Sequence, residues 1–143
     1  MQPLHFLVLA VAVSVLRRFP LPVTKYTAVG FVSVATAAGV LVVGPSTTGS
    51  ALFLGLMAAD RLWLRKDLGT AWVNAGREVL ALISAFGVFA WAATALGTGR
   101  ETAAGAELIP AMTLFLFSYF VFSRGLLYFT LMVRDKLLPD ERS

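Results

Sequence analysis

Arg124 has the most distinctive chemical setting of any residue in this sequence. It lies in the second half of the apolar stretch 108–133, which is long enough to cross a membrane. An arginine inside hydrocarbon is costly unless its side chain reaches the headgroups or meets a partner of opposite charge. Three interpretations follow: the guanidinium holds a phosphate in a groove, it is neutralised by Asp60 or Glu78, or it reaches the inner headgroups.

Charged residues are concentrated in the segment 60–78, between two apolar runs. Charge of this density cannot lie in hydrocarbon, so the segment is expected at or outside a membrane face. Its Lys and Arg residues predict that this face is cytoplasmic, because short basic loops are retained inside. The candidate ligands for a phosphate or a lipid headgroup are Arg61, Arg77 and Arg124. The candidate ion-pair partners are Asp60 and Glu78.

The composition restricts the chemistry that the chain can perform. Of the 143 residues, 58% are hydrophobic and 14% are charged, and the mean hydropathy is +0.80. Soluble domains have about 25% charged residues, so an integral membrane protein is predicted. Because there is no cysteine and only one histidine, no metal site, cofactor or enzymatic activity is expected. The net charge of +4 fits short loops at a membrane better than binding to nucleic acid.

Five apolar stretches are predicted to position the charged residues, as one all-α transmembrane domain. They are residues 3–19, 26–43, 51–64, 78–96 and 108–133. The first is short of the roughly 20 residues that a span needs. It either crosses by a thin or tilted path or lies half-inserted, which leaves four crossings. Residues 44–50 are predicted as an outer turn, and residues 68–76 as a cytoplasmic connector with Asn74 as a helix cap. Ala35 and Gly39 share one helix face and predict close helix packing.

The distribution of basic residues predicts the orientation of these helices. Ten of the twelve Lys and Arg residues fall on one side of the five-crossing arrangement, whereas Arg100 falls on the other side and Arg124 lies within a span. The basic side is expected to be cytoplasmic. The amino terminus is then outside and the carboxyl terminus inside. We expect a multi-pass protein of the cell membrane, in a prokaryote the inner or plasma membrane.

Short motifs relate the chain to a known family. Residues 25–30 (KYTAVG) follow an Arg-Phe-x-x-Val-Gly pattern, and residues 60–63 (DRLW) follow an Asn-x-Arg-x-Trp-like pattern. Weaker copies occur at residues 76–79 (GREV) and 123–126 (SRGL). In these features, over about residues 25–130, the chain resembles the GtrA-like family of small four-helix membrane proteins, with an additional amino-terminal helix. The resemblance implies translocation of polyprenyl-phosphate-linked sugars, or assistance to the glycosyltransferases that use them.

Two functions from different classes are therefore predicted. The first is a small non-enzymatic protein of the cell envelope that translocates or presents a polyprenyl-phosphate-linked sugar among membrane lipids. The alternative is an accessory subunit packed against a larger multi-subunit membrane complex, which short loops and small-residue helix faces suit equally well. A homo-oligomer or a larger membrane complex is expected in either role. A pore-forming oligomer is less favoured, because the predicted helices have no continuous polar stripe.

Overall fold

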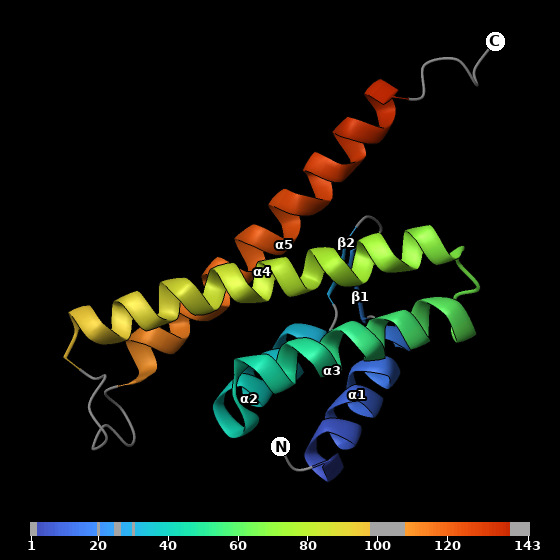
Figure 1. Cartoon of the computed structure of the whole chain (residues 1–143). Coiled ribbons are helices and arrows are strands. Elements are labelled where there is room, and N and C mark those ends of the chain that lie inside the picture. The colour runs from blue at the N-terminus through green and yellow to red at the C-terminus, as the bar shows by residue number, and fades with distance from the viewer. Residues whose placement is uncertain (1–2, 20, 25–26, 30, 98–107, 138–143) are drawn as a thin grey trace.

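The computed structural model describes residues 3–19, 21–24, 27–29, 31–97 and 108–137. They form five α-helices, a short β-hairpin and one π-helical turn (Figure 1). These are α1 (Pro3–Arg18), β1 (Leu21–Thr24), β2 (Thr27–Val29), α2 (Val32–Val43), α3 (Pro45–Ala58), the π-helical turn η1 (Ala59–Trp63), α4 (Leu68–Ala95) and α5 (Ile109–Leu137). The predicted helical fold is confirmed for this part of the chain. The hairpin is an addition that the apolar pattern did not indicate.

Two helices have the length and composition of membrane spans. Among the residues that the structure describes, these are α4 and the part Ile109–Arg134 of α5, with mean hydropathies of 1.7 and 1.5. The 28 residues of α4 rise by about 42 Å, which exceeds the roughly 30 Å of hydrocarbon in a bilayer. Only 22% and 11% of the most apolar windows of these helices are buried within the protein. Apolar faces left open to the surroundings are expected of helices that contact lipid.

The fourth helix is longer than predicted, because the expected connector of residues 68–76 is its first part. Asp67 caps this helix: its carboxylate accepts hydrogen bonds from the backbone N–H of Thr70 at 2.8 Å and from the Thr70 hydroxyl at 2.6 Å. The prediction of Asn74 as the cap is therefore wrong, and Asn74 lies inside the helix. Ala71 is fully buried and continues the inward face of α4. Packing of this face outweighs the loop character of the glycines in the segment.

A tight helical hairpin, α2–α3, replaces the predicted outer turn of residues 44–50. Only Gly44 separates the two helices, with a left-handed backbone conformation (φ 86°) that favours glycine. Pro45 opens α3 at a position where no hydrogen-bonding N–H is needed. The predicted span 51–64 therefore starts earlier, and its last part is η1. The predicted span 26–43 starts later, with α2, because the preceding residues form the antiparallel hairpin of β1 and β2.

Glycines bring α1 and α2 close to one another and to α3. A Cβ atom on Gly55 would lie 2.7 Å from the backbone oxygen of Ala10, and the Ser14 hydroxyl donates a 2.7 Å hydrogen bond to the Gly55 carbonyl. A Cβ atom on Gly39 would lie 2.8 Å from a methyl carbon of Leu9. Gly39 is therefore a point of close helix packing, as predicted.

The last helix, α5, packs against α4 in its first half and projects beyond the bundle in its second half (Figure 1). Phe115 and Tyr119 are buried in the hydrophobic core. Tyr128, further along the helix, is 65% exposed. The helix continues past the predicted end of the span 108–133, as far as residue 137. The part of α5 up to Leu127 is therefore the part that contributes to an internal site.

Candidate functional site

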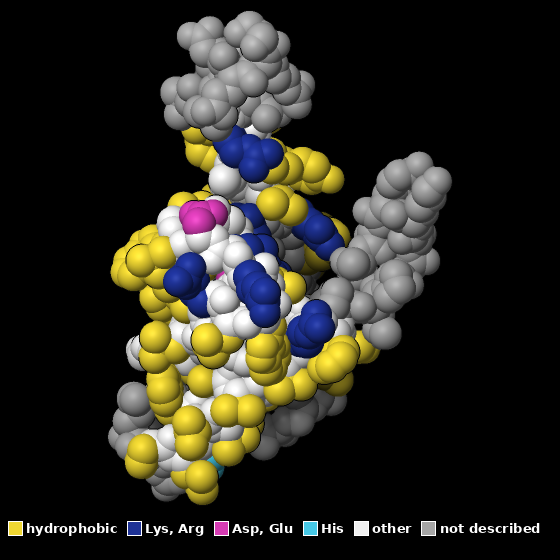
Figure 2. Space-filling model, turned by 90° about the vertical axis from the view of Figure 1, so that its right-hand side faces the viewer, with side chains coloured by type: hydrophobic (Ala, Val, Ile, Leu, Met, Phe, Trp, Pro, Cys, Tyr) yellow, Lys and Arg dark blue, Asp and Glu magenta, His cyan; other side chains and the backbone are white. Residues whose placement is uncertain are grey.

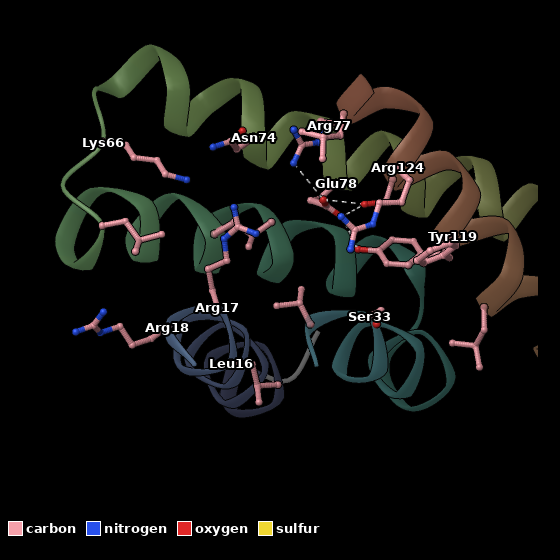
Figure 3. A pocket seen from close by; sticks show the side chains of 17 residues that line it. Leu16, Arg17, Arg18, Ser33, Lys66, Asn74, Arg77, Glu78, Tyr119 and Arg124 are labelled. Atoms are coloured by element: carbon pink, nitrogen blue, oxygen red, sulfur yellow. Dashed lines mark hydrogen bonds and ion pairs between the residues drawn. The ribbon is translucent and has the colours of Figure 1, made fainter. Parts of the chain in front are cut away.

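A cavity of about 710 Å³ lies where the five helices converge (Figure 3). Its cationic side chains, among the residues described, are Arg17, Arg18, Lys66, Arg77 and Arg124. Glu78 is the lining carboxylate in this part of the chain, and the uncharged polar side chains are Ser33, Asn74, Tyr119 and Ser123. The apolar wall consists of Leu16, Val32, Leu56, Leu64, Leu116, Phe120 and Leu127. Such a lining offers positive charge and an apolar surface side by side.

The π-helical turn at the end of α3 places Asp60 inside the bundle. In this wider turn the backbone N–H of Leu64 donates to the carbonyl of Ala59 at 3.1 Å, and that of Lys66 donates to the carbonyl of Asp60 at 2.9 Å. Asp60 is fully buried, whereas the next residue, Arg61, is exposed. Turns of this type are rare and are found frequently at functional sites.

Three side chains from different elements surround the Asp60 carboxylate. Asn74 in α4 donates a hydrogen bond of 2.8 Å through its amide nitrogen. Lys66 donates at 3.2 Å, and Nε of Arg17, near the end of α1, donates at 3.4 Å. A buried carboxylate is tolerated only when it is paired and hydrogen-bonded in this way. Asp60 therefore joins α1, the α3–α4 connection and α4 at one rim of the cavity.

Glu78 forms a second carboxylate centre, between α4 and α5. It accepts a 2.8 Å hydrogen bond from the Tyr119 hydroxyl and bonds of 2.9 and 3.0 Å from the Ser123 hydroxyl. Arg77 lies 3.4 Å from it. Tyr119 and Ser123 are four residues apart on α5 and so present their hydroxyls from one helix face. This network orients the polar side of α5 toward the cavity.

Arg77 has a buried donor that none of the described residues accepts. Its side chain is 10% exposed, and among the described residues its Nε is the buried side-chain atom without a hydrogen-bond partner. A buried donor without a partner is unfavourable, typically by about 1–3 kcal/mol. Since Arg77 lines the cavity, a rotation of its guanidinium would let an acceptor bound there satisfy Nε. Phosphate oxygens suit a guanidinium especially well, because its N–H groups bind them in pairs.

The structure brings together some of the predicted site residues and separates others. Arg124, Arg77 and Glu78 line the same cavity, and Figure 3 shows Arg124 on the same side of it as Glu78. The guanidinium carbon of Arg124 lies 5.7 Å from the ring centre of Phe120, within range of a cation–π contact. Asp60 was predicted as a partner of Arg124, whereas the ion pairs found among the described residues join Asp60 to Arg17 and Lys66.

The predicted ligand Arg61 lies outside the cavity. It is exposed and donates a 3.0 Å hydrogen bond to the backbone oxygen of Lys66. Its role there is to support the α3–α4 connection. The side chains that sequence analysis missed are Arg17, Lys66, Asn74, Tyr119 and Ser123. The four-residue spacing of Tyr119 and Ser123, in the span that also holds Arg124, was the available signal for two of them.

The arrangement favours binding of an anion. Within the part of the chain described, no three His, Cys, Asp or Glu side chains lie close enough together to hold a metal ion. Of the described residues, five cations and one carboxylate, Glu78, line the cavity, and Asp60 lies beside them, bound to Arg17 and Lys66. Comparisons of the chain with models of known protein families, with curated proteins and with solved structures found no match.

Proposed function

We propose that this protein is a non-enzymatic membrane protein that binds a phosphate-bearing lipid in its cationic cavity. The predicted role of translocating or presenting a polyprenyl-phosphate-linked sugar is one case of such binding. The observation that carries the proposal is the combination of five cations, an unused buried donor on Arg77 and an apolar wall in one cavity. The resemblance to the GtrA-like family supports the same substrate class and stays a prediction.

The apolar wall suits the hydrocarbon part of such a ligand. Leu116, Phe120 and Leu127 of α5 line the cavity. Leu116 and Phe120 are also 42% and 59% exposed, so this wall continues onto the outer surface of the helix. A phosphate can then sit among the cations while its chain leaves along α5 toward surrounding lipid. This arrangement removes the cost of placing a long apolar chain in water.

The expected topology is also proposed, with the cavity opening near the cytoplasmic face. The contacts of Asp60 with Arg17 and Asn74 bring the carboxyl ends of α1 and α3 beside the first turns of α4, as alternating crossings require. Figure 2 shows this end of the bundle, where Lys and Arg side chains gather beside apolar surface. Such an end is retained on the cytoplasmic side. A reporter fused after residue 143 should read cytoplasmic, and one inserted at residue 102 should read external; the reverse pattern contradicts the orientation.

Binding is tested with farnesyl phosphate, a short prenyl phosphate, and with farnesol as the uncharged control. The purified protein in detergent should bind the phosphate and not the alcohol. Arg77→Leu should weaken binding by at least about tenfold, because it removes charge-assisted hydrogen bonds to the phosphate. Arg61→Gln is the matched control, since it removes an exposed cation outside the cavity. Failure of the unaltered protein to bind farnesyl phosphate overturns the proposal.

Translocation is tested separately, in vesicles of phosphatidylethanolamine and phosphatidylglycerol that carry a fluorescent prenyl phosphate. A reductant added outside quenches only the outer leaflet, so movement of label from inside to outside is read from the slow phase of quenching. The unaltered protein should accelerate this phase, and Arg77→Leu should not. Binding without acceleration supports presentation of the lipid instead of translocation.

The alternative of an accessory subunit has one observation in its favour. The second half of α5 projects from the bundle (Figure 1) with large apolar side chains exposed, including Tyr128, Phe129 and Met132. A face of this kind suits a neighbouring helix as well as lipid. Purification in a mild detergent distinguishes the two roles. A stoichiometric larger partner supports the subunit, whereas the chain alone or a homo-oligomer that binds farnesyl phosphate supports the carrier.

A further inference from the structure

We infer that Asp60 competes with the bound phosphate for Arg17 and Lys66, and thereby limits how tightly the cavity holds its ligand. The inference deepens the proposed function and rests on it. Arg17 and Lys66 line the cavity and are also the two cations that the Asp60 carboxylate holds. A phosphate that enters the cavity must therefore share these two cations with Asp60 or draw them away from it.

The distances around Asp60 suit an exchange of partners. Its ion-pair contacts are 3.4 Å to Arg17 and 3.2 Å to Lys66. Strong charge-assisted hydrogen bonds between nitrogen and a carboxylate are about 2.7–2.9 Å long. The shortest contact is instead the 2.8 Å hydrogen bond from the neutral amide of Asn74. The carboxylate is thus anchored by Asn74, while its two cations are held more loosely.

The exposure of the three charged side chains also suits an exchange of partners. The Asp60 side chain has no exposed surface, whereas 28% of the Arg17 side chain and 32% of the Lys66 side chain are exposed. An incoming anion can therefore reach both cations without reaching Asp60. Long, flexible lysine and arginine stems can turn toward the cavity while the carboxylate stays in place. Asp60 then stays in place as an internal anion and competes with the ligand for these two cations.

The other carboxylate of the cavity has a different role. Glu78 is satisfied chiefly by the Tyr119 and Ser123 hydroxyls, at 2.8 and 2.9 Å. These hydroxyls are neutral, so a phosphate can bind in the cavity without drawing them away from Glu78. Arg77 also contacts Glu78, at 3.4 Å, through NH2, and its Nε has no hydrogen-bond partner among the described residues. Asp60 is therefore the carboxylate whose removal should release positive charge to the cavity.

The test is the variant Asp60→Asn, which removes the charge and keeps the shape of the side chain. Its amide oxygen can still accept from Asn74. The dissociation constant for farnesyl phosphate should fall by about threefold to tenfold, and farnesol should still not bind. The matched control is Asp67→Ser, which makes the same change of formal charge in the adjacent connector. A serine can still cap α4, so this control should leave the dissociation constant unchanged.

A measurement on the unaltered protein covers the case in which Asp60→Asn does not fold. The side-chain N–H signal of Arg17 and the Nζ signal of Lys66 are followed by nitrogen NMR, with Arg17→Lys and Lys66→Arg to assign them. Both signals should move during titration with farnesyl phosphate and stay in place with farnesol. Signals that remain fixed while the phosphate binds overturn the competition.

The outcomes separate the inference from the function on which it rests. Absence of binding by the unaltered protein overturns both. Binding by the unaltered protein, together with equal or weaker binding by folded Asp60→Asn, overturns only the competition and gives Asp60 a purely structural role. An equal gain in Asp67→Ser assigns the effect to general charge and also overturns it. Tighter binding in Asp60→Asn alone supports it.

Discussion

The hydroxyl of Tyr119 on α5 donates a 2.8 Å hydrogen bond to the Glu78 carboxylate on α4. Tyr119 is 3% exposed, so this bond forms in the core, between the two helices that have the length of membrane spans. It fixes which face of α5 looks toward the cavity.

Tyr119→Phe should lower the stability of the protein by about 1–2 kcal/mol, because it removes one donor to a nearly buried carboxylate. Ser123 still donates to Glu78, which keeps the loss moderate. The measurement is the thermal unfolding midpoint in detergent. Tyr128→Phe removes a hydroxyl from a 65% exposed side chain of the same helix and should leave the midpoint unchanged. Equal midpoints for the two variants contradict the structural role of Tyr119.

Gly55→Ala should destabilise the contact between α1 and α3. Its new methyl group would lie 2.7 Å from the backbone oxygen of Ala10, and a backbone atom cannot move aside as a flexible side chain can. Gly87→Ala is the control, since nothing lies within 4 Å of a Cβ atom there. Alanine in an open helical position is favoured over glycine by about 0.5–1 kcal/mol. The two variants should therefore shift the unfolding midpoint in opposite directions.

Arg124→Leu should weaken farnesyl phosphate binding, whereas Arg124→Lys should retain part of it. A lysine supplies the charge without the paired N–H groups of a guanidinium. The double variant Arg124→Leu with Glu78→Gln tests the alternative of a structural ion pair. A single variant that unfolds readily and a double variant that recovers stability would favour the pair. Arg134→Leu, at an exposed position of the same helix, is the control for the loss of one cation.

Asp67 should make the stability of α4 depend on pH. Hydrogen bonds from the Thr70 hydroxyl and backbone N–H lower the pKa of the Asp67 carboxyl below its ordinary value. The stabilisation is therefore complete above the pKa of the unfolded chain, about 3.9, and is lost as pH falls through the lower folded pKa. The difference in unfolding midpoint between the unaltered protein and Asp67→Ser should shrink on acidification over this window. A difference that stays constant with pH contradicts a role for the ionised cap.

The sequence predicted the parts of the site that follow from helix ends and hydropathy. Arg77 and Glu78 stand where a charged segment passes into an apolar one, and Arg124 stands inside an apolar stretch, so an inward position near one end of the bundle was foreseeable. Five helices were also found among the described residues, with shifted bounds, and α4 and α5 have the length of a span. Gly44 and Pro45 read as a turn, but they form the tight junction from which α3 starts.

The partners of Asp60 could not be predicted, for a local reason. A regular α-helix repeats every 3.6 residues, and that period alone does not reveal where a single wider turn occurs. The turn η1 gives Asp60 its place beside Asn74, fourteen positions along the chain. The hairpin β1–β2 was missed similarly, because Leu21–Thr24 and Thr27–Val29 are short segments between two apolar helices.

The turn η1 also sets the direction in which the chain leaves α3 and enters the connection to α4. A π-helical turn is equivalent to one residue inserted into an α-helix, and each residue of an α-helix corresponds to a rotation of about 100°. Deleting one residue from Ala59–Trp63 should therefore restore a regular helix and swing the connection that leads into α4 away from α1. Leu62 is 73% exposed and makes little contact of its own, yet its deletion should be far more disruptive than its replacement by alanine. Apart from Asp60, the number of residues in this segment is constrained more tightly than their identity.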